Sequence, residues 1–283
     1  MEKITKTIAN VIFVTLVAIV AYLLSGLLIG QFGEIDSDIK YVVSYSMPML
    51  LMLIGVTIYD RVVCKRTQRT MWSIRGFNPS MILWGVLLLV SLSIVLSPLM
   101  RLLPTATPFV ETEVWAVVTV ICIAPIFEEI LFRAKIFSVF RSTLSPTLSA
   151  VVTSAIFALM HGFTGVAIEA FLAGMIFSYV YIATSSIFAP IILHVFNNVI
   201  AFVMMQFMYQ ERTISDYIGA LESFDIIYAV ALLITIIGLI AIVRKYRLAD
   251  RVVREGGTLG NLSLKEQTVD EPIEDSDADE DVE

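Results

Sequence analysis

The chain has 283 residues, of which 58% are hydrophobic and 16% are charged. Soluble globular domains average about 45–50% apolar and about 25% charged residues, so this composition excludes an ordinary soluble domain and predicts a membrane protein. The net charge of −7 arises in the C-terminal segment 270–283, which holds nine acidic residues and no basic one. The two cysteines, Cys64 and Cys122, form no CxxC pair and indicate neither a disulfide framework nor a cysteine metal site.

Eight apolar stretches follow one another along the chain. A helix needs about 20 apolar residues to cross the roughly 30 Å of bilayer hydrocarbon. The first stretch is longer than the apolar region of a signal peptide, which has about 7–15 residues. The sequence therefore predicts an all-α fold, a polytopic transmembrane helical bundle of about eight spans. These spans are 8–30, 41–59, 81–103, 114–127 with its continuation, 146–160, 164–183, 187–208 and 226–243.

Basic residues gather in alternate connections between these spans. The loop after the second span holds five of them, the segment after the eighth holds five more, and the opposite loops hold few. Basic loops stay on the cytoplasmic side of a membrane. We therefore expect an integral protein of the cytoplasmic (inner) membrane with both termini in the cytoplasm.

Ionisable side chains inside a membrane span are costly and usually functional. Residues 124–133 read Ala-Pro-Ile-Phe-Glu-Glu-Ile-Leu-Phe-Arg. On a helix Glu129 and Arg133 share a face, whereas Glu128 is rotated by about 100°. We expect Arg133 to hold Glu129, while Glu128 faces a cavity where it can act as a general base. The alternative is a charge cluster at a helix end with a snorkelling arginine.

The only two histidines of the chain also lie in apolar segments. Phe157 and His161 are four residues apart at the end of the fifth span, and His194 and Asn198 are four apart in the seventh, with Asn197 beside them. An imidazole and an amide one turn apart can stabilise an oxyanion or hold a water or a metal. A single buried histidine is more often structural, but buried polar groups in lipid need one another as partners, which favours one shared site.

Several motifs of known protease classes are absent from the sequence. The chain has no HExxH zinc motif, no GxSxG nucleophile motif and no pair of aspartates within the spans. The remaining candidates are carboxylate, imidazole and amide groups. A further intramembrane carboxylate, Glu169, has no evident partner and is expected to be structural or to lie at a pore mouth.

The segments around these residues resemble the CPBP intramembrane metalloproteases, also called the CAAX protease and bacteriocin-processing or Abi family. The resemblance rests on Glu-Glu-x-x-x-Arg at 128–133, Phe-x-x-x-His at 157–161 and His-x-x-x-Asn at 194–198, and it covers roughly residues 112–200. It implies that Glu128 activates a water molecule as general base. It also implies that Glu129 pairs with Arg133 and supports the site.

The same resemblance implies roles for the histidines and the amide. His161 would help to position the water, and His194 and Asn198 would stabilise the oxyanion, with Phe157 and Asn197 in support. Two cofactor alternatives stay open. Either His161, His194 and Glu128 bind a zinc ion, because two imidazoles and a carboxylate can form a catalytic zinc site, or a carboxylate base works with hydrogen-bond donors and no metal.

The expected function is an intramembrane endopeptidase that hydrolyses a peptide bond of a membrane-associated or lipidated substrate. Its partners would be a hydrophobic peptide or membrane-protein substrate and the lipid bilayer, and no nucleic acid. One alternative is a non-catalytic membrane scaffold or immunity protein. Another is a proton-coupled transporter, although transporters often have repeated halves and no repeat is visible here. The depth of His161 fits poorly, because an outward-running fifth span would carry it about 22 Å from its start.

Four regions are predicted. Residues 1–111 form the first three transmembrane helices, and residues 112–208 form the catalytic transmembrane core. Residues 209–255 form the last helix with a basic juxtamembrane segment. Residues 256–283 are too polar and acidic to bury a core, so we expect a disordered tail.

Overall fold

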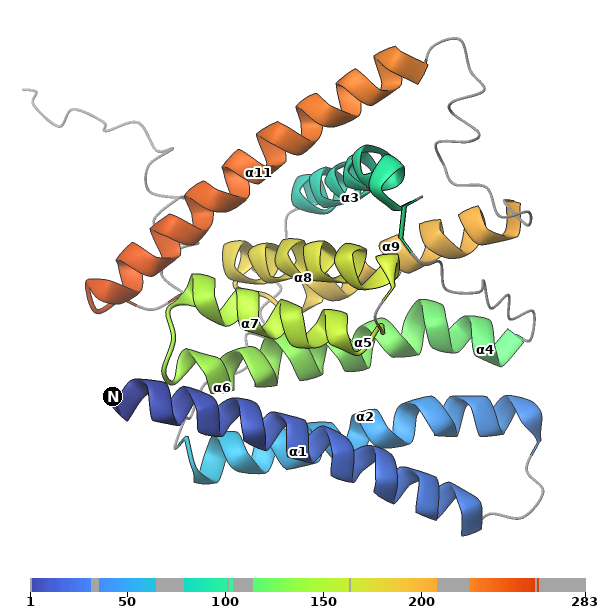
Figure 1. The fold of residues 1–283 in the computed structure, drawn as a ribbon, viewed down its shortest axis with the longest axis vertical. Helices are drawn as coiled ribbons and strands as arrows, with labels where there is room; N and C mark the ends of the chain where they lie inside the picture. The colour runs from blue at the N-terminus through green and yellow to red at the C-terminus, as the bar shows by residue number, and fades with distance from the viewer. Residues whose placement is uncertain are drawn as a thin grey trace, which may run out of the picture.

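The computed structural model describes residues 2–31, 36–64, 79–100, 102–103, 114–162, 164–207, 224–257 and 259. Every regular element in these ranges is a helix, and the helices pack side by side in one bundle (Figure 1), which confirms the predicted all-α fold. The elements are α1 (Glu2–Gln31), α2 (Ser37–Val62), α3 (Pro79–Met100), α4 (Val114–Val118), η1 (Thr119–Ile123), α5 (Ala124–Glu129), η2 (Ile130–Ile136), α6 (Phe137–Arg141), α7 (Pro146–Leu159), α8 (Gly165–Thr184), α9 (Phe188–Phe207) and α11 (Phe224–Arg254).

Six of the described helices are long and apolar enough to cross a membrane, and two shorter apolar helices, Pro146–Leu159 and Phe188–Met204, accompany them. The chain is therefore an integral membrane protein with about eight membrane helices. Helix α7 has 14 residues, and at about 1.5 Å per residue it extends about 21 Å, which is less than the hydrocarbon thickness. Helix α7 is thus too short to cross the hydrocarbon by itself, and His161 follows its C-terminal end.

The fourth predicted span is one continuous rod, Val114–Arg141, made of α4, η1, α5, η2 and α6. The expected continuation beyond residue 127 is thus helical up to Arg141. Two π-helical segments, η1 and η2, lie on either side of α5. Such π turns are rare and occur frequently at functional sites, and here they flank the six residues that carry the two glutamates.

Two groups of buried side chains hold the bundle together. One joins α8 to α3, α9 and α11, and the other joins the rod to α1, α2 and α7. Helix α11 approaches α3 closely at Gly238, where a Cβ atom would overlap the side chain of Leu88; small residues permit such close contacts between membrane helices. Helix α1 buries one face, with Asn10, Val14 and Ala21 on it, so its other faces are left for lipid.

Polar contacts tie the helices together at the end of the bundle where α1 begins. The hydroxyl of Tyr59 on α2 donates to Asn10 Oδ1 at 2.8 Å, and Asn10 Nδ2 donates to the carbonyl of Val139 on α6 at 3.3 Å. Asp250 of α11 accepts from the backbone N–H of Thr147 at 3.0 Å and from the hydroxyl of Ser145 at 3.3 Å. Asp250 thus adds an acceptor at the N-terminus of α7 and fastens α11 to it.

Some predictions fall outside the described residues. Of the tail predicted for 256–283, only Gly256, Gly257 and Leu259 are described. The basic loop segment 65–78 also lies outside the described residues. Two of the three limits between the four predicted regions fall within residues 104–113 and 208–223, which are also not described, and the third falls at residues 255 and 256. The four-region division stays a prediction.

Candidate active site

Proline in the rod prepares one contact of the site. In η1 the N–H of Ala124 donates to the carbonyl of Thr119, five residues back. The corresponding partner of the Val120 carbonyl would be the N–H of residue 125, but Pro125 has none. The side chain of Asn198 on α9 fills this place, because its Nδ2 donates to the Val120 carbonyl at 2.8 Å. The missing backbone donor thus connects the rod to α9.

Glu129 and Arg133 form a fully buried ion pair, as their spacing predicts. Both side chains are 0% exposed, and Arg133 Nη1 lies 3.1 Å from Glu129 Oε1. Arg133 Nη2 also donates to the carbonyl of Gly174 on α8 at 3.1 Å. The guanidinium carbon lies 4.9 Å from the ring centroid of Phe157 and 5.3 Å from that of Phe177. Charge pairing, a carbonyl and aromatic faces together replace part of the water that a buried arginine loses. Among the described residues, Arg133 Nε and Glu129 Oε2 have no hydrogen-bond partner.

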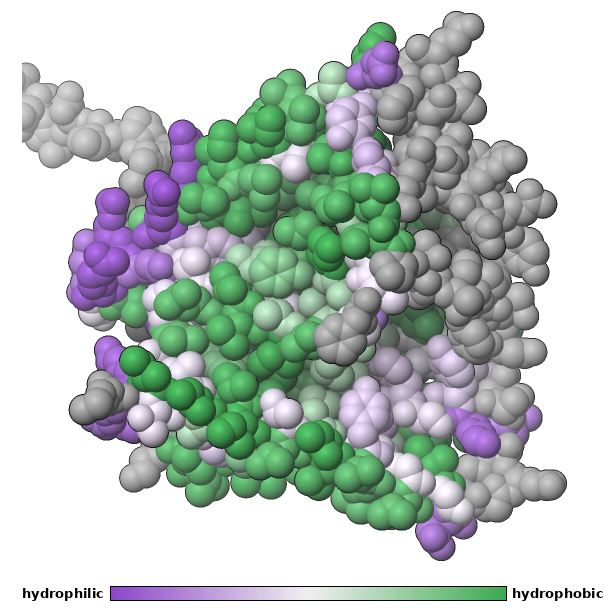
Figure 2. Space-filling model, in the orientation of Figure 1, coloured by the Kyte–Doolittle hydropathy of each residue, from purple (hydrophilic) through white to green (hydrophobic). Residues whose placement is uncertain are grey.

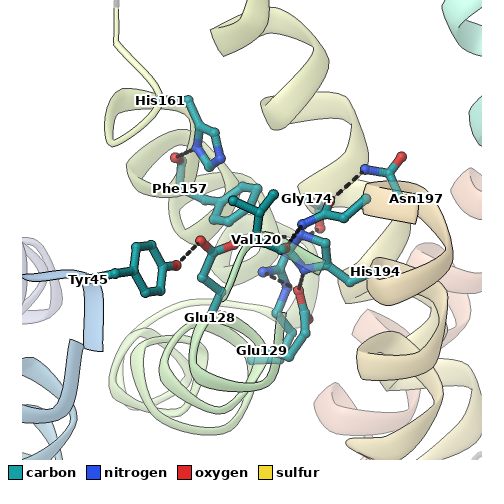
Figure 3. Close-up of polar contacts among 11 residues, drawn as sticks. Tyr45, Val120, Glu128, Glu129, Phe157, His161, Gly174, His194 and Asn197 are labelled. Atoms are coloured by element: carbon teal, nitrogen blue, oxygen red, sulfur yellow. Dashed lines mark hydrogen bonds and ion pairs between the residues drawn. The ribbon is translucent and has the colours of Figure 1, made fainter. Parts of the chain in front are cut away.

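His194 connects the two glutamates (Figure 3). Its Nδ1 lies 2.8 Å from Glu129 Oε1, and its Nε2 lies 3.6 Å from Glu128 Oε2. Because Glu129 accepts, a proton is assigned to Nδ1, and Nε2 faces Glu128. The ring stacks on Phe177 at a centroid distance of 4.6 Å. The imidazole is thus fixed in one orientation and can take up a proton between two carboxylates.

Glu128 has a different environment from its neighbour, as predicted from the helical rotation between them. Its Oε1 accepts a 2.5 Å hydrogen bond from the hydroxyl of Tyr45 on α2, while Oε2 faces His194. The residue is 8% exposed, compared with 0% for Glu129. Glu128 makes no ion pair with a lysine or arginine among the described residues. Its carboxylate is the less neutralised of the two and is the better candidate for accepting a proton.

His161 lies near this group without joining it directly. It follows the end of α7, is solvent-exposed, and its Nδ1 lies 2.8 Å from the carbonyl of Phe157. Since that carbonyl can only accept, Nδ1 carries the proton and Nε2 of the neutral ring is bare. The Phe157 ring lies 4.6 Å from the His161 ring and 6.0 Å from the His194 ring, so it separates the two imidazoles (Figure 3).

The remaining predicted residues lie on α9 and α8. Asn197 Nδ2 donates to Asn198 Oδ1 at 3.2 Å, so the two amides support each other beside the rod. Asn198 donates one of its two amide hydrogens to the carbonyl oxygen of Val120. Glu169 is partly buried near the start of α8, and no hydrogen bond or ion pair joins it to another described residue.

The predicted zinc ligands match a metal site in chemistry but not in arrangement. Both histidines have Nδ1 held by an oxygen atom, as metal-bound histidines do. Among the residues that the structure describes, however, no three His, Cys, Asp or Glu side chains come together as a metal-binding group. In this arrangement His161, His194 and Glu128 are therefore not grouped as ligands of one metal ion.

Sequence reasoning missed three groups that complete the site. Tyr45 stands on α2, far from every motif, and nothing in its own segment distinguishes it. Gly174 offers its carbonyl to Arg133, and a Cβ atom there would lie 3.0 Å from Ser154 Oγ and 3.3 Å from Arg133 Nη2. A glycine in an apolar span is a weak signal of close approach. Phe177 lies one turn after Gly174 and shares its face, which could have suggested that both meet the same partner.

The fold and the site define a class: a polytopic helical membrane protein with a buried carboxylate–imidazole site at the level of its spans. Residues 110–200 match a family model described as type II CAAX prenyl endopeptidase Rce1-like. This match confirms the resemblance to the CAAX protease family and supports a CAAX-type protease. It covers the rod, α7, α8 and more than half of α9, whereas Tyr45 lies outside it. Comparisons with curated proteins and with solved structures found no match.

Proposed function

We propose that this protein is an intramembrane endopeptidase that hydrolyses a peptide bond of a membrane-associated or lipidated substrate with a water activated by Glu128. The observation that carries the proposal is the meeting of Tyr45, Glu128, His194 and Glu129 in one buried chain of contacts. The match to a CAAX protease family model over the same helices supports the reaction class.

In the proposed reaction a water molecule contacts both Glu128 and His194 from the side of the gap between them, since their facing atoms are 3.6 Å apart, too far for a direct hydrogen bond. Glu128 removes a proton as the water oxygen attacks the peptide carbonyl. The C–N bond then breaks, and Glu128 returns the proton to the leaving amine. Tyr45 holds the other carboxylate oxygen, which keeps the reacting one directed toward the water.

The tetrahedral intermediate carries a negative oxygen that needs donors. We assign this task to a protonated Nε2 of His194, supported by Glu129 and Arg133, and to the second amide hydrogen of Asn198. His161 is assigned to the approach of the water or the substrate, because its bare Nε2 is on the exposed side of Phe157. No step requires a metal ion.

The proposed setting is the cytoplasmic membrane with both termini in the cytoplasm. Its support is the basic end of the bundle, where α1 begins and α2 and α11 end. The substrate is proposed to be a hydrophobic peptide or a membrane protein. For a soluble chain, moving polar backbone groups from water into a site among membrane helices would cost free energy.

The test uses protein purified in detergent and reconstituted in liposomes. The probe is a fluorogenic peptide with a farnesylated cysteine in a C-terminal Cys-aliphatic-aliphatic-X sequence, and its unlipidated twin is the comparison. Glu128→Gln keeps the shape of the side chain and removes the base, so we expect cleavage to fall by about 10²–10⁴-fold. The matched control is Glu2→Gln, because Glu2 is exposed at the far start of α1 and pairs only with Lys6.

An unchanged unfolding temperature of Glu128→Gln would show that the loss is catalytic. Wild-type rates in Glu128→Gln would overturn the proposed base. Failure of the wild type to cleave either peptide would favour the non-catalytic scaffold. Zinc content per chain, measured with and without chelation alongside activity, distinguishes the two cofactor alternatives.

A further inference from the structure

Helix α11 carries one continuous exposed face along its whole length. Ile226, Val230, Leu233, Ile237 and Ile240 follow one another at steps of four and three residues, and each is between 47% and 68% exposed. The opposite face is buried at Ala231, Thr235, Ile242, Tyr246 and Ala249, where α11 packs on the bundle. A face so apolar and so exposed in a membrane helix is covered by lipid tails.

The same face changes from aliphatic to arginine at a single point. After Ile240 the next positions in the series are Arg244, Arg247, Arg251 and Arg254, and all four are exposed. No ion pair joins any of them to another described residue. We call these four residues the arginine stripe. It continues the lipid-facing surface in register, so the arginines face lipid rather than protein.

We expect the stripe to begin at the depth of phospholipid headgroups, because it directly follows the apolar part of the same helix face. From Arg244 to Arg254 the helix rises about 15 Å, whereas the polar region on each side of a bilayer is only about 5–8 Å deep. Figure 1 shows α11 crossing the bundle obliquely, which keeps more of the stripe near the membrane surface than an upright helix would. In Figure 2 hydrophilic residues gather at the left end of the molecule, where α11 ends.

We propose that the arginine stripe of α11 is a binding site for anionic phospholipid headgroups. A guanidinium group makes paired hydrogen bonds with phosphate oxygens and keeps its charge at any physiological pH. Several such groups beside the end of a membrane helix attract anionic lipid. Lipid is favoured over other occupants because lipid tails already cover the apolar part of the same face. This inference does not depend on the proposed proteolytic function.

The experiment measures thermal unfolding of the full chain in detergent with added dioctanoyl phosphatidylglycerol or dioctanoyl phosphatidylcholine. A ligand that binds only the folded state raises the unfolding midpoint. We expect phosphatidylglycerol to raise it by several degrees more than phosphatidylcholine, and salt to weaken the difference. In the triple variant Arg247→Gln, Arg251→Gln and Arg254→Gln, the apparent affinity for phosphatidylglycerol should fall at least about tenfold.

The matched control removes three exposed cations from the same end of the bundle but off the stripe: Lys3→Gln, Lys6→Gln and Arg61→Gln. This control should retain the preference for phosphatidylglycerol. Equal midpoints with the two lipids in the wild type, or equal losses in the two triple variants, would overturn the proposal. The acidic segment 270–283 is the alternative occupant of the arginine stripe. The proposal would also be overturned if the full chain showed no preference for phosphatidylglycerol and the preference appeared only after this segment was deleted.

Discussion

Adjacent glutamates have different environments in this site because their partners differ. Glu129 forms an ion pair with a guanidinium and accepts a hydrogen bond from an imidazole, and it is fully buried, so its negative charge has a cation beside it. Glu128 accepts only from a hydroxyl and faces the imidazole across 3.6 Å. Removing one member of a buried ion pair typically costs about 3–5 kcal/mol, because the other charge is left uncompensated. Variants of Glu129 and Arg133 therefore report on folding as much as on catalysis, whereas variants of Glu128 and Tyr45 are cleaner probes.

Tyr45→Phe tests whether the tyrosine positions the base. The change removes one hydrogen bond to a carboxylate, a contact that contributes about 1.5–3 kcal/mol, while the ring still fills its place. We expect kcat to fall by about 10–100-fold with little change in KM. The measurement is steady-state cleavage of the farnesylated peptide in liposomes.

Tyr228→Phe is the matched control, because its hydroxyl bonds the carbonyl of Val95 between α11 and α3, away from the site. A purely structural role for Tyr45 would lower the unfolding temperature and leave kcat of the folded fraction unchanged. That result would contradict the assignment.

At the scale of the element, the hydrogen bonding of the rod depends on one missing backbone N–H group. Pro125 supplies no N–H to the Val120 carbonyl, and Asn198 supplies one from another helix. A break in one helix's hydrogen bonding thus becomes a contact between two helices. Helix α5 lies between the two π segments, and both of its glutamates, Glu128 and Glu129, are buried.

A double-mutant cycle on Pro125 and Asn198 tests this coupling. Asn198→Ala in the native background leaves the Val120 carbonyl without a partner, and we expect a loss of about 1–3 kcal/mol in the free energy of unfolding. In a Pro125→Ala background the new backbone N–H can take over, so the same change should cost about 1 kcal/mol less. Denaturant unfolding in detergent gives the four values. Equal costs in the two backgrounds would mean that the proline does not create the role of Asn198.

For the whole molecule, the site needs four separate helical elements of the chain. Helix α2 supplies Tyr45, the rod supplies both glutamates, α8 supplies the carbonyl of Gly174, and α9 supplies His194. The end of the bundle where α1 begins holds these parts in place through Asn10 and Asp250. The stability of that end therefore matters for a site that lies elsewhere in the bundle.

Asp250→Ala tests this connection. The change removes the acceptor of the Thr147 N–H and of the Ser145 hydroxyl, so the first turn of α7 keeps its N-cap Ser145 but loses a second acceptor and its tie to α11. Loss of an acceptor at a helix N-terminus costs about 0.5–2 kcal/mol, and we expect a drop of that size in the free energy of unfolding. Asp225→Ala, at the exposed first turn of the same helix, is the control and should change little. Equal effects of the two changes would contradict the proposed tie.

The sequence by itself determined the class of fold and most of the polar residues of the site. Apolar runs of about 20 residues are long enough to cross a bilayer, and in lipid a helix pairs all the backbone polar groups of such a run internally. The all-α bundle therefore followed from hydropathy. The spacing of Glu129 and Arg133 placed them on one helix face, and their ion pair is present. Motif order also pointed to His194 and to Glu128.

Only the tertiary structure decided which side chains meet. Tyr45 comes from a helix that carries no motif, and its contact with Glu128 depends on how α2 packs against the rod. Asn198 bonds the Val120 carbonyl because a proline on another helix leaves it free. His161 stands apart from His194 because α7 ends early and the Phe157 ring lies between them. Spacing along a chain fixes faces of single helices, whereas the approach of one helix to another depends on packing that no single segment encodes.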